Sequence, residues 1–395
     1  MAIFKSVFSF LKKEKTIIDQ SGYLLLADII GTIVSFTSNF FLSLVLGPAG
    51  FGTLKTVASF FENFPVRMGF NTTLIKYLPE LEAQNSLGKI KCLLKSFLKI
   101  RLIIVLITAV IFFLLRRQLS LWLLGTCTYN NLICAGIILF IVAFSDLFRP
   151  CVIGFRNYRL YVNINFLIST LRNVLALALA LIWGITGAIF GLSLGIIPGL
   201  GLCLKFLFQK KIFSVQKEKI DTWQIIKHYS LPTYFVNLTG LAGSLIVPLL
   251  ALFYKQEIIG YYSFAMMISS NIALISGAIG QIFFPEVALE HFKNGASGSL
   301  RKLKRVLVLF LLACIIIIPL GIGISKPLIL RYSPAYSSAI PIVRSLFLIY
   351  CLIGALSLVT AYYTAVGENK VAAMVSLFSS VVLFSLSFWM LKLVK

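Results

Sequence analysis

Nine charged residues that stand inside or at the edges of long apolar segments are the ones best placed to bind a ligand or an ion. An ionised side chain in mid-bilayer costs roughly 2.5 to 3.5 kcal/mol on an insertion scale, so each needs a partner or a wet cavity. The nine are Lys55, Arg67, Arg149, Arg172, Lys205, Arg344, Asp28, Glu62 and Asp146. Cations that face a cavity without a partner predict an anionic ligand, and buried carboxylates are natural carriers of a coupling H+ or Na+.

Some of these charges also have a purely structural interpretation. Lys55 with Glu62, and Asp146 with Arg149, are spaced to form ion pairs that only neutralise a helix. Lys205 and Arg149 can also extend their charged ends to the inner interface of the membrane. For Lys55 and Glu62 both interpretations stay open.

Two other arginines lack an acidic partner in their own segments. We expect Arg172 and Arg344 to face a cavity, because no acid in the same span would neutralise them. Arg67 points away from the neighbouring polar stripe on a helical wheel. It joins the cavity only if Pro65 bends the helix beside it.

Polar residues at helical spacing accompany these charges and form two stripes. One stripe comprises Asp28, Thr32, Ser35 and Asn39. The second comprises Lys55, Ser59, Glu62, Gly69 and Thr73, with Asn63 at its border. Two polar stripes on adjacent helices indicate one hydrated cavity, and we expect Asn39, Asn63 and Asn271 to line it.

The elements that carry these residues are membrane-spanning helices. Hydrophobic residues make up 59% of the 395 residues and charged ones 12%, and the mean hydropathy is +0.96. These values exclude a soluble globular domain and predict an all-α integral membrane protein. Apolar windows predict about eleven spans, near residues 21–46, 50–76, 102–124, 131–153, 161–183, 187–208, 229–253, 258–284, 306–325, 338–365 and 371–391.

The distribution of Lys and Arg fixes the expected orientation. With the N-terminus inside, inner loops hold 23 of these residues and outer loops 7, so the positive-inside rule places the N-terminus in the cytoplasm of a plasma (inner) membrane protein. Residues 1–20 form an amphipathic cytoplasmic segment. The basic residues behind the formal charge of +23 lie mostly in these loops, where they favour anionic lipid headgroups. The charge therefore needs no nucleic-acid partner, and we expect none.

Several chemistries are excluded by missing motifs. The sequence has no phosphate loop, and its two histidines, His228 and His291, have no second ligand at metal spacing. The seven cysteines are scattered without a C-x-x-C pair, as small core residues are. We therefore expect no catalytic residues, no metal and no cofactor beyond a coupling ion. Transport is the function class that remains.

An internal repeat organises the chain. A shift of 208 residues lays Gly52, Asn63 and Gly69 on Gly260, Asn271 and Gly277. The repeat predicts an N-lobe at 21–208, a basic cytoplasmic linker at 209–228 and a C-lobe at 229–395, packed around a central cationic cavity.

Six stretches resemble a known family. They are L-G-P-A-G-F-G-T-L (46–54), G-F-N-T-T-L-I-K-Y-L-P-E (69–80), G-F-R-N-Y (154–158), W-G-I-T-G-A-I-F-G (183–191), and Y-S-P-A-Y-S-S-A-I-P (332–341) with A-V-G-E-N-K (365–370). The chain resembles polysaccharide members of the multidrug/oligosaccharidyl-lipid/polysaccharide (MOP) superfamily, and Wzx-type O-antigen flippases most of all.

The resemblance implies a MATE-like fold of two six-helix lobes and alternating access that flips polyprenyl-pyrophosphate-linked oligosaccharide for polysaccharide, O-antigen and lipopolysaccharide synthesis. The expected partners are the lipid-linked oligosaccharide, membrane lipids and the glycan polymerase machinery. Pyrophosphate would contact the cations, and the acids would carry the coupling ion. These site residues are Arg172, Arg344, Arg67 and Lys55 for pyrophosphate, and Asp28 and Glu62 for the ion.

One departure and two alternatives accompany the resemblance. A twelfth span is absent after residue 391, which puts the C-terminus outside and makes a truncated chain one explanation. A cation-coupled multidrug antiporter of the MATE type would favour a more acidic cavity. A membrane glycan polymerase or ligase would need catalytic residues in outer loops, and these loops are very short.

Overall fold

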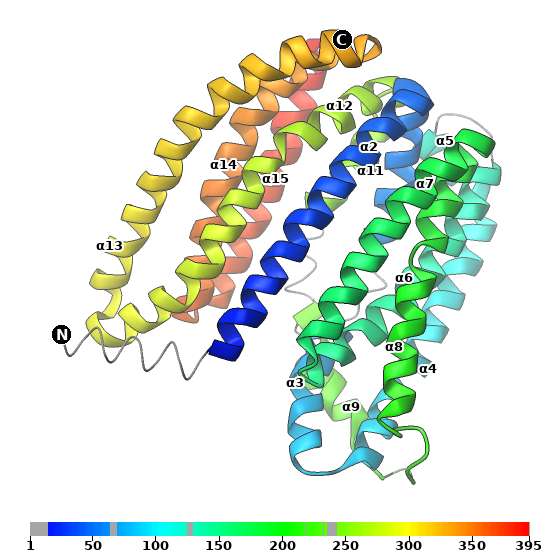
Figure 1. The fold of residues 1–395 in the computed structure, drawn as a ribbon, viewed down its shortest axis with the longest axis vertical. Coiled ribbons are helices and arrows are strands. Elements are labelled where there is room, and N and C mark those ends of the chain that lie inside the picture. Colours follow the sequence, from blue (N-terminus) through cyan, green and yellow to red (C-terminus); the bar gives the residue numbers. More distant parts are fainter. Residues whose placement is uncertain are drawn as a thin grey trace. The chain divides into compact units, whose positions relative to one another are not determined.

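The computed structural model describes residues 15–63, 69–124, 129–216, 218–231, 233–234 and 243–394. All regular structure in these residues is helical (Figure 1). The chain packs into two compact units. Unit 1 comprises Met1–Val45, Val66–Arg116 and Asn130–Tyr234, and unit 2 comprises Leu46–Pro65, Arg117–Tyr129 and Phe235–Lys395.

Unit 1 holds the first arm of the long helix α2 (Lys15–Asn63) and most helices of the first half. Its other elements are α3 (Phe70–Ala83), α4 (Leu87–Leu114), α6 (Tyr129–Gly154), α7 (Tyr158–Leu194), α8 (Ile197–Gln209), α9 (Thr222–Ile225) and a π-helical turn at Ile226–Ser230. The predicted linker packs here: Lys91 Nζ donates to the carbonyl oxygens of Phe213 and Val215, at 2.7 Å each.

Unit 2 holds the second arm of α2 and the helices of the second half. These are α5 (Arg116–Leu124), α11 (Ile246–Ala251), α12 (Gln256–Ser269), α13 (Asn271–Tyr332), a 3-10 turn at Pro334–Tyr336, α14 (Ala339–Val366) and α15 (Asn369–Val394). The division into units therefore differs from the repeat, because segments of the first half pack with the second. The lobes at 21–208 and 229–395 stay a prediction.

Glycines turn the long helices back on themselves. The backbone φ is +64° at Gly47, +58° at Gly184 and +65° at Gly295, a conformation that only glycine adopts readily. The first two positions are the short outer loops expected from the sequence. The break expected near Pro65 lies outside the described residues, and α3 begins at Phe70 after Gly69 (φ +66°).

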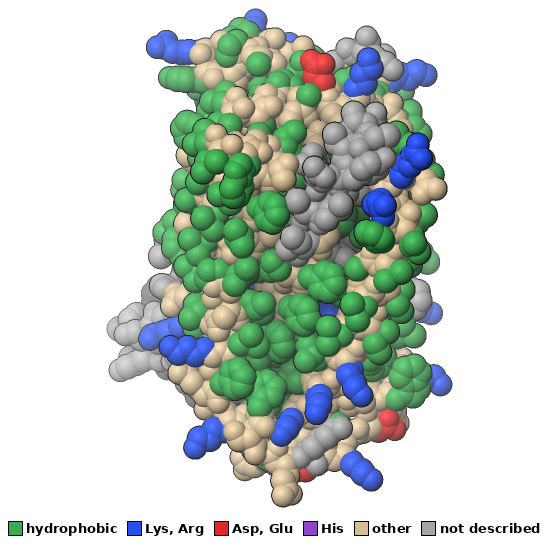
Figure 2. Space-filling model, turned by 90° about the vertical axis from the view of Figure 1, so that its right-hand side faces the viewer, with side chains coloured by type: hydrophobic (Ala, Val, Ile, Leu, Met, Phe, Trp, Pro, Cys, Tyr) green, Lys and Arg blue, Asp and Glu red, His purple; other side chains and the backbone are tan. Residues whose placement is uncertain are grey.

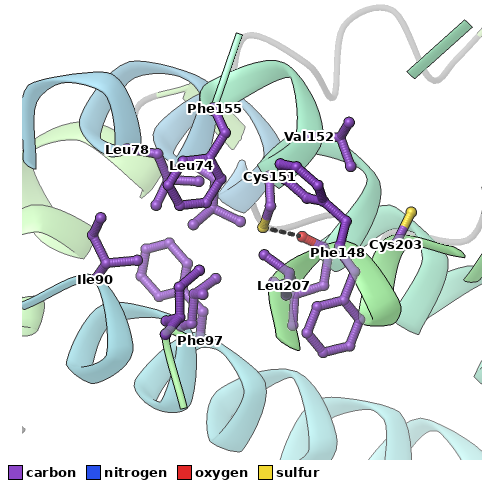
Figure 3. Packing of buried hydrophobic residues seen from close by; sticks show 14 of the residues in the cluster. Leu74, Leu78, Ile90, Phe97, Phe148, Cys151, Val152, Phe155, Cys203 and Leu207 are labelled. Carbon is purple, nitrogen blue, oxygen red and sulfur yellow. Dashed lines mark hydrogen bonds between the residues drawn. The ribbon is translucent and has the colours of Figure 1, made fainter. Parts of the chain in front are cut away.

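Unit 1 has a well-packed apolar core between α3, α4, α6 and α8 (Figure 3). Phe70 and Phe97 stack with their ring centroids 4.4 Å apart. Cys151 belongs to this core, and its thiol donates to the Leu147 carbonyl oxygen at 3.5 Å. The described cysteines are all free, and four of the five are buried, which confirms their role as small core residues. Cys127 and Cys134 lie outside the described side chains.

The outer surface of both units is apolar. Seven described helical segments are long and apolar enough to cross a membrane, and two of them, Ile30–Asn63 and Tyr158–Gln209, each overlap two predicted spans. In α4, Ile107, Val110 and Phe113 are all more than half exposed. Figure 2 shows such side chains across the middle of the drawn face, with Lys and Arg toward both its upper and lower ends. This is the surface of a protein solvated by lipid.

Two sequence expectations need correction. The span expected at 102–124 is two helices, because α4 already begins at Leu87 and ends at Leu114, where the arginine pair of α5 follows. Arg101, counted as a loop residue, lies in α4 and is fully buried. The span expected at 229–253 falls partly outside the described residues.

Candidate substrate-binding site

A polar seam joins α2 and α7 inside unit 1. Asn39 Nδ2 donates to Asn173 Oδ1 at 3.5 Å, and Asn173 Nδ2 donates to the Ser169 carbonyl oxygen at 2.8 Å. The helices approach closely because Gly31 faces Ser169, with 3.6 Å between the position of a Cβ at Gly31 and Ser169 Oγ. Asn39 therefore occupies a helix contact, and part of the first predicted stripe pairs with α7.

Arg172 stands next to this seam. It is half-buried, directly precedes Asn173 on α7, and its Nε is buried from solvent. The chain that follows the turn at Gly184 packs closely against the Arg172 backbone: a Cβ at Gly195 would lie 2.3 Å from the Arg172 backbone N. Close packing thus fixes the turn of α7 that carries the guanidinium. A fixed guanidinium presents planar donors that suit a phosphate oxygen.

A glycine at every fourth position builds this packing, and the sequence analysis missed it. The stripe consists of Gly187, Gly191, Gly195 and Gly199. A Cβ at Gly187 would lie 2.0 Å from the Leu179 carbonyl oxygen, and one at Gly191 would lie 2.4 Å from the Ala176 Cα. Small residues at every fourth position are typical of membrane helices that pack closely, and this pattern in the sequence could have predicted the contact.

Unit 2 holds the charged pair of the second stripe. Lys55 is half-buried on α2 with its Nζ 5.2 Å from the Phe51 ring centroid, a cation–π distance. Glu62 is half-buried in the last turn of the same helix, seven residues on. The spacing puts both side chains on one face, as the sequence predicts.

Arg344 is exposed near the start of α14. Ser269 Oγ on α12 donates to the Val343 carbonyl oxygen at 3.2 Å, so the turn that carries Arg344 lies against the end of α12. Asn271 is exposed two residues beyond Ser269. Unit 2 therefore brings Asn271 and Arg344 to neighbouring turns.

The asparagines share one bonding pattern. Nδ2 of Asn39, Asn63 and Asn271 donates to the backbone carbonyl four residues earlier, at 2.7, 2.9 and 3.2 Å. Asn63 and Asn271 are equivalent in the 208-residue repeat, and so are their acceptors, Ser59 and Met267. This bond satisfies a donor that lipid cannot.

Two groups of predicted residues remain. The Asp146–Arg149 ion pair is present, at 3.5 Å, so the structural interpretation holds for it. The Asp28 side chain and Arg67 lie outside the described residues. Among the described residues, no cluster of His, Cys, Asp and Glu could hold a metal ion.

Arg101 is a buried cation that the sequence analysis did not select. Its guanidinium carbon lies 5.7 Å from the Phe70 ring centroid, inside the unit 1 core. Lys95 and Lys99 on the same helix are exposed. Lys95 and Lys99 are four residues apart and share one face of the helix, and Arg101 lies on another face. This difference in helical phase was the sequence signal that Arg101 is buried.

The fold defines a class of protein. The chain is similar to a multidrug resistance MATE transporter of the MOP superfamily in an inward-facing conformation (TM-score 0.75, 11% identity, 92% of this chain and 94% of that one). It is also similar to the lipid II flippase MurJ (TM-score 0.68, 13% identity, 94% and 87%) and to a Pyrococcus furiosus MOP transporter (TM-score 0.57, 12% identity, 96% and 94%). These likenesses show the MOP fold.

The family follows from a model described as polysaccharide biosynthesis protein, which matches residues 17–288. The chain belongs to this polysaccharide biosynthesis protein family. No curated protein matches the chain.

Proposed function

We propose that this chain flips polyprenyl-pyrophosphate-linked oligosaccharide repeat units from the inner to the outer leaflet of the plasma membrane by alternating access. The family supports the polysaccharide substrate class. The likeness to a lipid II flippase supports a fold able to move a lipid-linked glycan. O-antigen synthesis is the proposed use.

The observation that carries the proposal is Arg172 beside the Asn39–Asn173 seam. A half-buried guanidinium in an apolar helix favours an anion, and a pyrophosphate offers several oxygens to its donors. Neighbouring amides suit sugar hydroxyls, because an amide both donates and accepts hydrogen bonds. Arg344, on unit 2, is the second cation that we propose for pyrophosphate.

The first prediction tests these two arginines. Arg172→Ala and Arg344→Ala should insert normally but lose at least about tenfold in glycan export, the factor that ~1.4 kcal/mol of lost ligand binding gives. Surface glycan in a complemented flippase-null strain measures the effect. Arg331→Ala, which removes an exposed cation at the end of α13, is the matched control. Wild-type surface glycan from both test variants would sink the assignment.

A vesicle assay separates this function from multidrug efflux. Purified protein in vesicles receives either a fluorescent lipid-linked glycan or ethidium under the same ion gradient. We expect movement of the glycan only. Transport of ethidium without the glycan would assign the chain to the antiporter class.

A further inference from the structure

A helix crossing in unit 2 joins the two halves of the internal repeat. The second arm of α2 packs against the start of α12 so closely that a Cβ at Gly52 would lie 1.9 Å from the Gln256 carbonyl oxygen. A Cβ at Gly260 would lie 1.8 Å from the Pro48 carbonyl oxygen. The two backbones therefore touch.

The crossing is symmetric under the repeat. A shift of 208 residues carries Pro48 to Gln256 and Gly52 to Gly260. Gly52 meets Gln256, and Gly260 meets Pro48, so each half presents the same pair of positions to the other. Such a mutual contact is what a pseudo-two-fold relation between the halves produces.

One side chain fastens the crossing. Gln256 Oε1 accepts a hydrogen bond from Thr56 Oγ1 at 3.2 Å, and its Nε2 donates to the Leu123 carbonyl oxygen on α5. Thr56 is fully buried. Pro48, the repeat equivalent of Gln256, has no side-chain donor or acceptor, so this fastening exists on one side only.

We infer that this crossing is the outer closure of the transport pathway and that Gln256 is the positioning residue that latches it. By the expected orientation, Gly47–Pro48 and Lys255–Gln256 lie at outer ends of their spans. The α2 arm belongs by sequence to the first half, and it must leave α12 if the halves part on that side. The inference rests on the proposed alternating-access function.

A labelling experiment tests the closure without using any substrate. Ser263, 3% exposed and one turn beyond Gly260, is replaced by Cys in a cysteine-free background and treated from outside with a membrane-impermeant maleimide. Gly52→Ala and Gly260→Ala should raise its labelling rate by about tenfold, because a Cβ prevents backbone contact. The control is Gly277→Ala, since a Cβ there meets nothing within 4 Å.

The latch has its own variants. Thr56→Val should raise labelling several-fold, and Thr56→Ser, which keeps the hydroxyl donor, should restore the wild-type rate. Equal labelling in all glycine and threonine variants would overturn the inference.

A cross-link keeps the test decisive if the glycine variants do not fold. Thr56→Cys with Gln256→Cys is bridged by a short reducible bifunctional thiol reagent, and we expect transport to stop and to return after reduction. Undiminished transport by the bridged protein would show that the crossing never opens. Failure of the wild type to move glycan would sink the proposed function alone, because the labelling result is independent of it.

Discussion

The polar residues of the spans are bonded locally before they can meet a substrate. Each described asparagine that the sequence assigned to the cavity donates a side-chain N–H to the backbone carbonyl oxygen four residues earlier. This bond lets an amide enter the bilayer without an unsatisfied donor.

The second prediction concerns the two acids of the polar stripes. If Asp28 or Glu62 binds the coupling cation, Asp28→Asn or Glu62→Gln should abolish the dependence of glycan transport on the ion gradient, because an amide keeps the shape and loses the charge. Transport into vesicles is measured with and without the gradient. Asp146→Asn, at a residue already paired with Arg149, is the control. Full gradient dependence in both test variants would favour structural pairing instead.

The close approach of paired helices in unit 1 depends on glycines, which have no side chain. The four glycines of the α7–α8 stripe let two antiparallel arms approach to backbone contact, where van der Waals packing is greatest. The same contact holds Arg172 in place. Under the proposed function, stability and ligand binding are therefore coupled through this hairpin.

The third prediction tests this coupling. Gly191→Ala places a Cβ 2.4 Å from the Ala176 Cα, and we expect it to lower stability by about 1–3 kcal/mol, as overpacking does. Gly201→Ala should leave stability unchanged, because a Cβ there meets nothing within 4 Å. Thermal unfolding of both purified variants measures the difference. Equal unfolding temperatures would contradict the packing.

The sequence predicted the turns of the molecule better than its contacts. The family motifs mark backbone geometry: Gly47 and Gly184 turn at positive φ, Gly367 (φ +92°) ends α14, and Asn157 caps α7 by accepting from the Leu160 N–H at 3.2 Å. Such features are local, so a short motif is enough to encode them. Their match identifies the family and says little about the ligand.

Contacts between distant helices were harder to predict. Periodicity shows that Asn39 lies on a polar face but not that this face meets Asn173 on α7. It likewise sets Arg101 on another face than Lys95 and Lys99 but does not show that this face meets Phe70. Both depend on which helices become neighbours, and that is a property of the whole fold.

The fourth prediction concerns the topology of the whole chain. The Lys and Arg asymmetry and an odd number of spans place Lys395 outside and Lys217 in the cytoplasm. A Cys added after Lys395 should react with an impermeant maleimide in intact cells or spheroplasts, and one at position 217 only after lysis. Protection of the C-terminal Cys until lysis would mean that one expected span is wrong.

The contact of Gly52 with Gln256 and Gly260 also sets an order for biosynthesis. About 200 residues separate the partners, and at roughly 5–20 residues per second the ribosome needs about 10–40 s to make them. During that interval the second arm of α2 is in the membrane with its glycine face open to lipid. The first half of the chain therefore cannot complete its own packing, and insertion of α12 is the step that allows it to finish folding.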